Sequence, residues 1–317
     1  MHLAVYLPLL FPLLAAPAAR PLADRLEPRL ATLLLTAGAV VLAAGSTTVL
    51  GLLALAGLVR IPLVAQLAHL SPAVLERDDP AWISVAVVAA LLLLAVIAVG
   101  SRSLYRRVRA VCAAVLEAAC FPGQDALVVL EEQGADAFAM PGLPGRIVVS
   151  TGMLATLDAT EREILLAHER AHLRGHHYLF TATVQLAAAA NPLLRPLAEQ
   201  VAYTVERWAD EAAVRVTGDR RRVAVTVGKA ALAAKHSGGR RRLPAAALGL
   251  LGRVRRRDRL DAAAGPVPRR VAALLSPRPT GGRWKAAAAT AYIAAAALCT
   301  AEAVQDLHEV LKRAKGG

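Results

Sequence analysis

The chain of 317 residues is 56% hydrophobic but only 4% aromatic, and it carries 37 Lys and Arg against 24 Asp and Glu. A soluble domain is about 45–50% apolar with Gly included, so this composition excludes a disordered chain and an ordinary soluble enzyme. Three cysteines cannot form a disulfide framework, and we interpret Cys112, Cys120 and Cys299 as packing residues. The apolar residues lie in blocks, which indicates a membrane protein.

Four uncharged stretches are apolar enough for membrane-spanning helices, which need roughly 20 residues or slightly fewer. They are 2–19, 30–59, 81–100 and 286–301. Pro, Gln and His interrupt a fifth stretch, 61–75, so an interfacial or re-entrant segment is expected there. The small residues at 15–19 leave cleavage of the first stretch as a signal peptide open as an alternative.

Orientation follows from Lys and Arg in the short loops, which favour the cytoplasmic side. Three arginines lie at 20–29 and four at 102–109, whereas the loop at 60–80 has two arginines beside three acidic residues. The consistent solution places the N-terminus outside, 20–29 inside and the 60–80 loop outside. Residues 102–283 are then cytoplasmic, and the tail lies outside.

These stretches divide the chain into four parts. An N-terminal membrane domain of about three transmembrane helices covers 1–101, and a cytoplasmic domain with a basic C-terminal half covers 102–283. A final transmembrane helix covers 284–302, and a short tail follows at 303–317. Residues 102–283 are long enough to form a domain with its own core.

Short strands are expected near the start of the cytoplasmic part. Residues 126–130 and 146–150 have the β-branched character of strands, and Gly142, Pro144 and Gly145 supply a turn between them.

A helix that begins at Asp158 carries the candidate chemistry. Asp158 and Glu161 form a capping pattern, and the helix then reads His168-Glu169-Arg-Ala-His172. Two imidazoles at i and i+4 lie about 5–6 Å apart on one face, close enough to bind one zinc ion. Glu169 follows the first His and can act as general base on water. The alternative is a surface helix with charges at ordinary spacing, against which the core-like run at 164–167 argues.

Catalytic zinc usually has three protein ligands, so a third is required. His176 continues the spacing of four, although Gly175 can end the helix first. Glu206 is the better candidate, because Asp210 lies one turn beyond it and can accept a hydrogen bond from a ligand imidazole. On spacing alone, such a pair is also typical of a solvated helix face.

The uncharged segment 178–194 lies between these candidates. If it crossed the membrane once, the ligands would lie on opposite sides, which metal coordination forbids. We therefore expect a helix packed beneath the site.

Lys and Arg are in excess at 212–285, with clusters at 220–222, 240–242 and 253–259. Such a region is typical of a surface that contacts anionic membrane lipid. It has neither interleaved aromatic residues nor a DNA-binding motif, which argues against nucleic acid as a partner.

Three motifs in this order resemble the BlaR/MecR-type membrane zinc metallopeptidases. They are His168-Glu-Arg-Ala-His172, Asn191-Pro-Leu-Leu194 and Glu206-Arg-Trp-Ala-Asp210. The chain is similar, more loosely, to HtpX-type membrane proteases, through Ala137-Phe138-Ala139 and the segment 146–152. The resemblance implies one zinc ion per chain, bound by His168, His172 and Glu206, with Glu169 activating water and Asp210 supporting the site.

One departure from these families concerns the group that supports the ligands. They often have Asp five residues after the second His, where this chain has His177. A supporting carboxylate contact is then absent, or His177 bonds differently.

An extended substrate peptide could pair with the edge of the strand at 146–150, as in β-augmentation. The substrate-binding candidates are Ala137, Phe138, Ala139, Ile147, Val148 and Val149.

The sequence thus predicts a mainly α fold: a polytopic helical membrane protein of the cell membrane with a cytoplasmic α+β, zincin-like metallopeptidase domain. The expected activity is that of a zinc metalloendopeptidase in signal transduction, and by resemblance its substrate is a BlaI/MecI-type transcriptional repressor. The large extracellular penicillin-binding sensor is missing, so β-lactam sensing is not expected. Two alternatives are HtpX-like quality control of membrane proteins and a membrane scaffold with a vestigial zinc motif.

Overall fold

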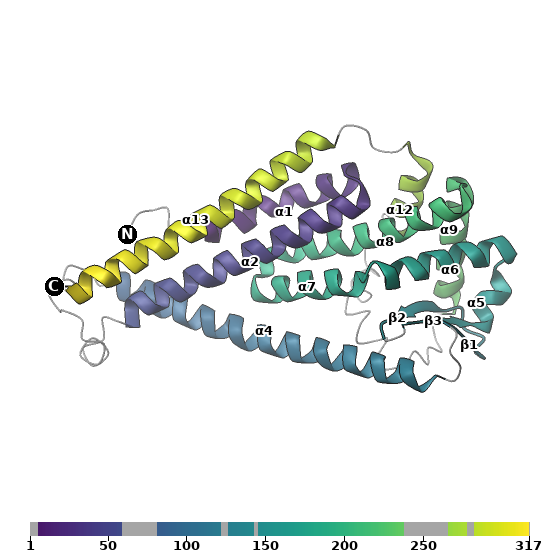
Figure 1. Ribbon diagram of the computed structural model, residues 1–317, viewed down its shortest axis with the longest axis horizontal. Helices are drawn as coiled ribbons and strands as arrows, with labels where there is room; N and C mark the ends of the chain where they lie inside the picture. Colours follow the sequence, from purple (N-terminus) through teal and green to yellow (C-terminus); the bar gives the residue numbers. More distant parts are fainter. Residues whose placement is uncertain are drawn as a thin grey trace.

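A computed structural model describes residues 6–58, 81–121, 126–142, 145–237, 266–277 and 282–316 of the chain (Figure 1). Helices α1 (Leu7–Arg25), α2 (Pro28–Leu58) and α13 (Arg283–Gly316) occupy one end of the molecule, and α4 (Ala81–Cys120) runs from there to the other end. The other end holds a small sheet with α5 (Thr151–Thr156), α6 (Ala159–Arg174), α9 (Arg220–His236) and α12 (Pro266–Leu275). Helices α7 (His177–Ala190) and α8 (Arg195–Thr217) connect the two ends.

Three helices in the described part of the chain are long and apolar enough to cross a membrane. They are Pro28–Leu58, Ser84–Cys120 and Arg283–Asp306, and they match the second, third and fourth predicted spans. The first predicted span differs, because α1 contains three internal prolines and continues through Arg20, Asp24 and Arg25, which lower its mean hydropathy. Residues 1–5 and the predicted re-entrant segment 61–75 lie outside the described residues.

The outer face of α4 fits a lipid environment. Val87, Leu91, Leu94 and Ile97 are each more than half exposed. Such a row would be covered by acyl chains in a bilayer.

The interpretation of the cysteines as packing residues is wrong for Cys112 and Cys120, which are also exposed on α4.

Helices α7 and α8 form a hairpin that lies against α2 (Figure 1). A short 3-10 turn, Pro192–Leu194, joins them. Near the tip, Asn191 Nδ2 donates to Ser46 Oγ, 3.0 Å away, in the middle of α2. On the return, the hydroxyls of Thr204 and Thr32 are hydrogen-bonded at 2.9 Å, near the start of α2. The segment 178–194 therefore turns back beside α2 instead of crossing once, and it returns the chain to the end where α6 lies.

The sheet has the order β1-β3-β2, with β1 (Leu127–Leu130) parallel and β2 (Ala137–Met140) antiparallel to the central β3 (Arg146–Ser150). Strands β1 and β3 are the two predicted ones. The expectation of edge pairing at 146–150 is wrong, because β3 is paired on both sides and Ile147, Val148 and Val149 are buried. Within the described residues, the edges belong to β1 and β2.

Helix α6 begins as predicted. Asp158 Oδ1 accepts from the Glu161 N–H, and the Glu161 carboxylate accepts from the Asp158 N–H, both at 2.8 Å. This capping box satisfies two backbone donors of the first turn. Ile164 of α6 packs into a buried cluster with Ala213 of α8, Val223 of α9 and Leu274 of α12. This core fixes α6 against α8 and so positions the side chains that face each other between them.

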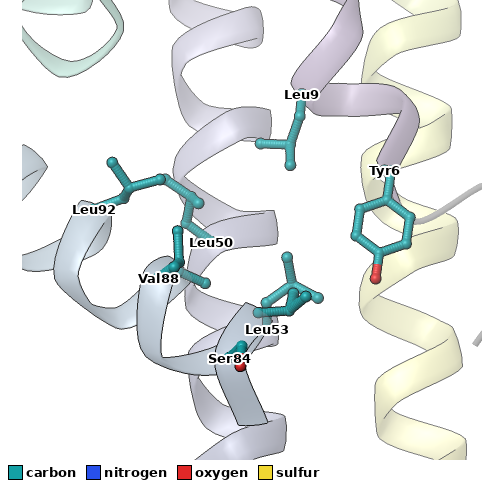
Figure 2. A pocket seen from close by; sticks show the side chains of 9 residues that line it. Tyr6, Leu9, Leu50, Leu53, Ser84, Val88 and Leu92 are labelled. Atoms are coloured by element: carbon teal, nitrogen blue, oxygen red, sulfur yellow. The ribbon is translucent and has the colours of Figure 1, made fainter. Parts of the chain in front are cut away.

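An apolar cavity of about 320 Å³ lies among α1, α2 and α4 (Figure 2). Leu9, Leu50, Leu53 and Val88 contribute to its lining. It adjoins the second half of α2, whereas the histidines of α6 lie toward the other end of the molecule (Figure 1).

Candidate metal centre and active site

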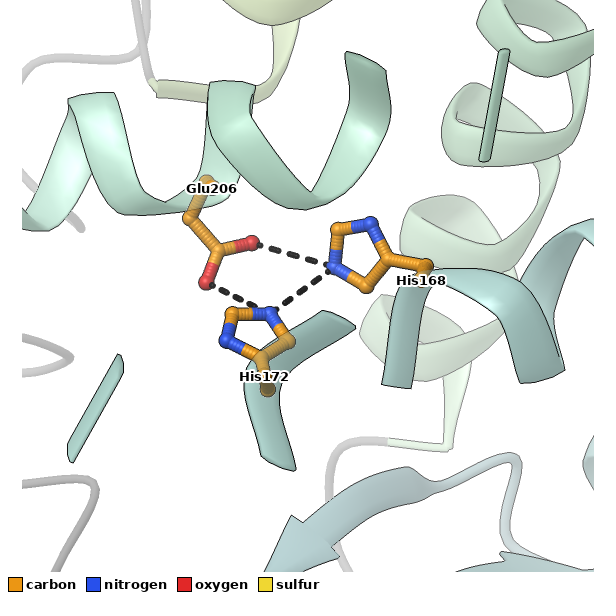
Figure 3. A group of neighbouring side chains, drawn as sticks. All are labelled: His168, His172 and Glu206. Carbon is orange, nitrogen blue, oxygen red and sulfur yellow. Dashed lines mark hydrogen bonds and ion pairs between the residues drawn. The ribbon is translucent and has the colours of Figure 1, made fainter. Parts of the chain in front are cut away.

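Two histidines of α6 and one glutamate of α8 point toward a common centre (Figure 3). The Nε2 atoms of His168 and His172 are 3.1 Å apart. Glu206 Oε2 lies 3.6 Å from His168 Nε2, and Glu206 Oε1 lies 3.6 Å from His172 Nε2.

This donor set fits a zinc ion. One ligand atom from each of the three side chains lies within 4.8 Å of the others. Two imidazole nitrogens and a carboxylate oxygen are a recurrent ligand set of catalytic zinc, in which a fourth position stays open. The structure thus brings together the three residues that the sequence analysis singled out, although α6 and α8 are separated by the whole of α7.

Asp210 holds His168 from behind. Its Oδ1 lies 3.1 Å from His168 Nδ1, and its side chain is buried. A hydrogen bond from Nδ1–H to this carboxylate leaves the Nε2 lone pair directed at the common centre. Burial alone would lower the pKa of His168, but the contacts with Asp210 and Glu206 outweigh it and raise the pKa to about 10, so the ring would give up its Nε2 proton on binding a metal ion.

His177 takes the corresponding place behind His172. Its Nδ1 lies 3.0 Å from His172 Nδ1, and its ring packs against Trp208 of α8 with centroids 4.6 Å apart. If His172 Nε2 faces a metal, His172 Nδ1–H is the donor and His177 Nδ1 the acceptor. Burial lowers the pKa of His177 to about 4 and that of His172 to about 3, so both rings are neutral at pH 7.

His176, the alternative third ligand, is turned away from this arrangement. Helix α6 ends at Arg174, and His176 adopts a left-handed conformation with φ 47°. Its ring packs against Tyr178, with centroids 6.2 Å apart. The chain reversal at Gly175 thus ends the series of histidines four residues apart. It brings His177, and not His176, next to His172.

Replacing His177 with alanine is expected to weaken zinc binding about 10–100-fold, because outer partners of ligand histidines contribute on that scale. His177→Asp should restore most of the affinity, since a carboxylate accepts the same hydrogen bond. Titration of the metal-free protein with zinc against a chromophoric chelator measures the effect. His176→Asn, which tolerates a left-handed backbone, is the matched control and should bind zinc like the wild type.

Glu169 lies next to the centre in a buried position. Its side chain accepts a hydrogen bond from the backbone N–H of Ala139 in β2. Burial is the main cause that raises the pKa of its carboxyl group to about 6. A carboxyl group with such a pKa can both accept and return a proton near neutral pH.

Arg270 is a residue of this site that sequence reasoning missed. It reaches the centre from α12, and its guanidinium contacts both Glu206 and Asp210. Its position in a region rich in Arg gave no signal, since nothing in the sequence separates it from its neighbours. The contacts with Arg270 and His168 hold the pKa of the Glu206 and Asp210 carboxyls below their usual values, although burial acts in the opposite direction.

Residues 103–203 match the sequence model of a protein family described as Peptidase family M48. The match supports a metallopeptidase of that family, and M48 peptidases are generally zinc-dependent. It includes β1 to α7 with His168, Glu169 and His172, and it ends before Glu206 and Asp210. Neither the curated proteins nor the solved structures contain a significant match to the chain.

Proposed function

We propose that the protein is a membrane zinc endopeptidase that hydrolyses peptide bonds of a protein substrate. The observation that carries the proposal is the convergence of His168, His172 and Glu206 on one point, with Glu169 buried beside them. The match of 103–203 to a peptidase family supports it independently. A scaffold with a vestigial motif is less consistent with this arrangement, because a site free of selection would be expected to lose its ligands.

Each residue of the site has a distinct role in the proposed reaction. His168, His172 and Glu206 would hold the zinc ion, which supplies Lewis-acid polarisation of the scissile carbonyl when bound. Glu169 accepts a proton from the attacking water and delivers it to the leaving amine. Asp210 and His177 keep the two imidazoles in the tautomers that binding requires.

Strand β2 supports a specific mode of substrate binding. The N–H of Ala139 points to Glu169 and not to β3, so the free edge of β2 faces the proposed general base. A peptide that added to this edge would lie extended beside Glu169. Substrate binding is therefore proposed for the edge at Ala137 and Ala139, whereas Phe138 and the β3 residues Ile147, Val148 and Val149 are buried in the core.

The proposed substrate is a protein that reaches the cytoplasmic surface of the membrane. The arginines at 102–109 favour this orientation by the positive-inside rule. Basic residues in the second half of the chain would contact anionic lipid, although the clusters 240–242 and 253–259 lie outside the described residues. The resemblance to BlaR/MecR-type proteins favours a BlaI/MecI-type repressor as substrate, and hence signal transduction. The HtpX-like alternative would degrade misfolded membrane proteins.

Removal of the metal tests the proposed function. Protein purified in detergent should contain one zinc ion per chain by atomic absorption and should cleave dye-labelled casein. Dialysis against a chelator should abolish cleavage, and added zinc should restore it. A protein without zinc, or one whose cleavage resists the chelator, would rule out the proposal. Cleavage of a purified repressor but not of an unfolded membrane protein would then favour signal transduction over quality control.

A further inference from the structure

Arg270 makes a more extensive set of contacts than any role in packing would require. Its Nε and Nη2 atoms donate to Asp210 Oδ2 and Oδ1, at 2.8 and 2.6 Å. Its Nη1 lies 2.8 Å from Glu206 Oε2. Only 12% of its side chain and 2% of that of Asp210 are exposed, so this pair interacts away from bulk water, whereas Glu206 is 37% exposed.

The geometry of these contacts depends on the shape of a guanidinium group. Its planar fork binds both oxygens of Asp210 and still reaches the carboxylate one helical turn earlier. Glu206 is thereby held through Oε2, whereas Oε1 faces His172 Nε2 at 3.6 Å. Because Oε2 also lies 3.6 Å from His168 Nε2, Arg270 fixes the orientation of the Glu206 carboxylate toward both histidines.

The same residue acts on His168 through Asp210. Asp210 Oδ1 is shared by Arg270 Nη2, at 2.6 Å, and His168 Nδ1, at 3.1 Å. The buried Asp210 carboxylate and the partly exposed Glu206 carboxylate lie one turn apart and repel each other unless a cation lies between them. Arg270 supplies that cation and holds Asp210 Oδ1 within hydrogen-bond distance of the His168 ring.

Contacts with other helices hold α12 in place near both of its ends, and they give Arg270 a defined position. The neighbouring Arg269 lies 3.6 Å above the Tyr203 ring and pairs with Asp24 of α1 at 2.6 Å. Arg220 of α9 donates to the carbonyls of Leu274 and Ala273 at the other end of α12.

We infer that Arg270 is a positioning residue of the metal centre, which clamps Glu206 and Asp210 in the arrangement that binds zinc. The inference rests on the proposed function, because it assumes that Glu206 and His168 are ligands. It extends the site to α12, beyond the residues 103–203 that match the peptidase family.

Arg270→Lys tests whether the metal centre needs the shape of the guanidinium group or only its positive charge. Lysine keeps the positive charge but lacks the planar fork, so it cannot hold both carboxylates in the same geometry. We expect zinc affinity to fall at least about tenfold, the scale of outer-partner effects. The affinity is measured by competition between the metal-free protein and a chromophoric chelator for added zinc. Arg221→Lys, at an exposed position of α9 away from these contacts, is the control and should bind zinc as the wild type does.

A double-mutant cycle that combines Arg270→Lys with Asp210→Asn tests whether Arg270 affects zinc affinity through Asp210. If Arg270 acts through Asp210, the loss in the double variant should be smaller than the two single losses combined. Independent losses would overturn the inference, as would wild-type affinity in Arg270→Lys. Tighter binding in that variant would show that Arg270 competes with the metal and would also overturn it.

Two further outcomes remain distinct from these. Thermal melting of the metal-free variants should show them folded at the assay temperature, and an Arg270→Lys protein that is unfolded there would identify a residue needed for the fold, against the inference. A wild-type protein that binds no zinc would instead remove the proposed function itself.

Discussion

Replacing Glu169 with glutamine is expected to lower the rate of peptide hydrolysis about 10²–10⁴-fold and to leave the zinc content unchanged. The amide retains the size of the side chain but can no longer accept the proton of the attacking water. Because Glu169 lies beside the metal-binding residues without being one of them, its loss should separate catalysis from metal binding. Cleavage of dye-labelled casein and atomic absorption on the same preparation measure both quantities.

Glu163→Gln is the matched control for this prediction, because Glu163 is an exposed residue of the same helix. It should cleave casein at the wild-type rate. Equal activity in the Glu169 and Glu163 variants would exclude Glu169 as the general base and, with it, the proposed mechanism.

Replacing Glu206 with alanine is expected to weaken zinc binding by more than about a hundredfold, since loss of a ligand should exceed the loss of an outer partner. Cleavage should disappear with the metal. The removal also leaves Arg270 with Asp210 as its remaining carboxylate contact in the site. Zinc content after gel filtration and competition with a chelator report the change.

The control for this variant is Glu199→Ala, an exposed position on the same helix, which should retain full zinc content and activity. Full zinc content in Glu206→Ala would assign the third ligand elsewhere. His176, the other candidate, would then have to leave the left-handed conformation that it adopts in the structure.

Features that depend on local sequence could be predicted. The start of α6 follows from the reciprocal contacts of Asp158 and Glu161, which span only three residues. Strands β1 and β3 follow from their β-branched residues, and the convergence of the α6 histidines follows from helical spacing. A single membrane crossing by 178–194 could be excluded from the sequence, because it would separate the proposed ligands, but the place of the turn, at 191–194, could not be predicted.

Features that depend on tertiary contacts could not be predicted in the same way. Strand β2 consists of Ala137-Phe-Ala-Met140, which has no β-branched residue, and it forms by pairing with β3. The central place of β3 is a property of strand order, which sequence periodicity does not encode. Arg270 belongs to the site only because α12 folds back over α8, across residues that carry no recognisable motif.

The α7–α8 hairpin also bears on how the metal centre assembles. Roughly thirty residues separate His172 from Glu206, and closing a flexible loop of that length costs about 3 kcal/mol of chain entropy. The contacts of Asn191 with Ser46 and of Thr204 with Thr32 link the hairpin to α2 without any contribution from a metal. Association with α2 therefore offsets much of the entropy before an ion binds. Helix α2 thus acts as a template on which the proposed metal centre is assembled.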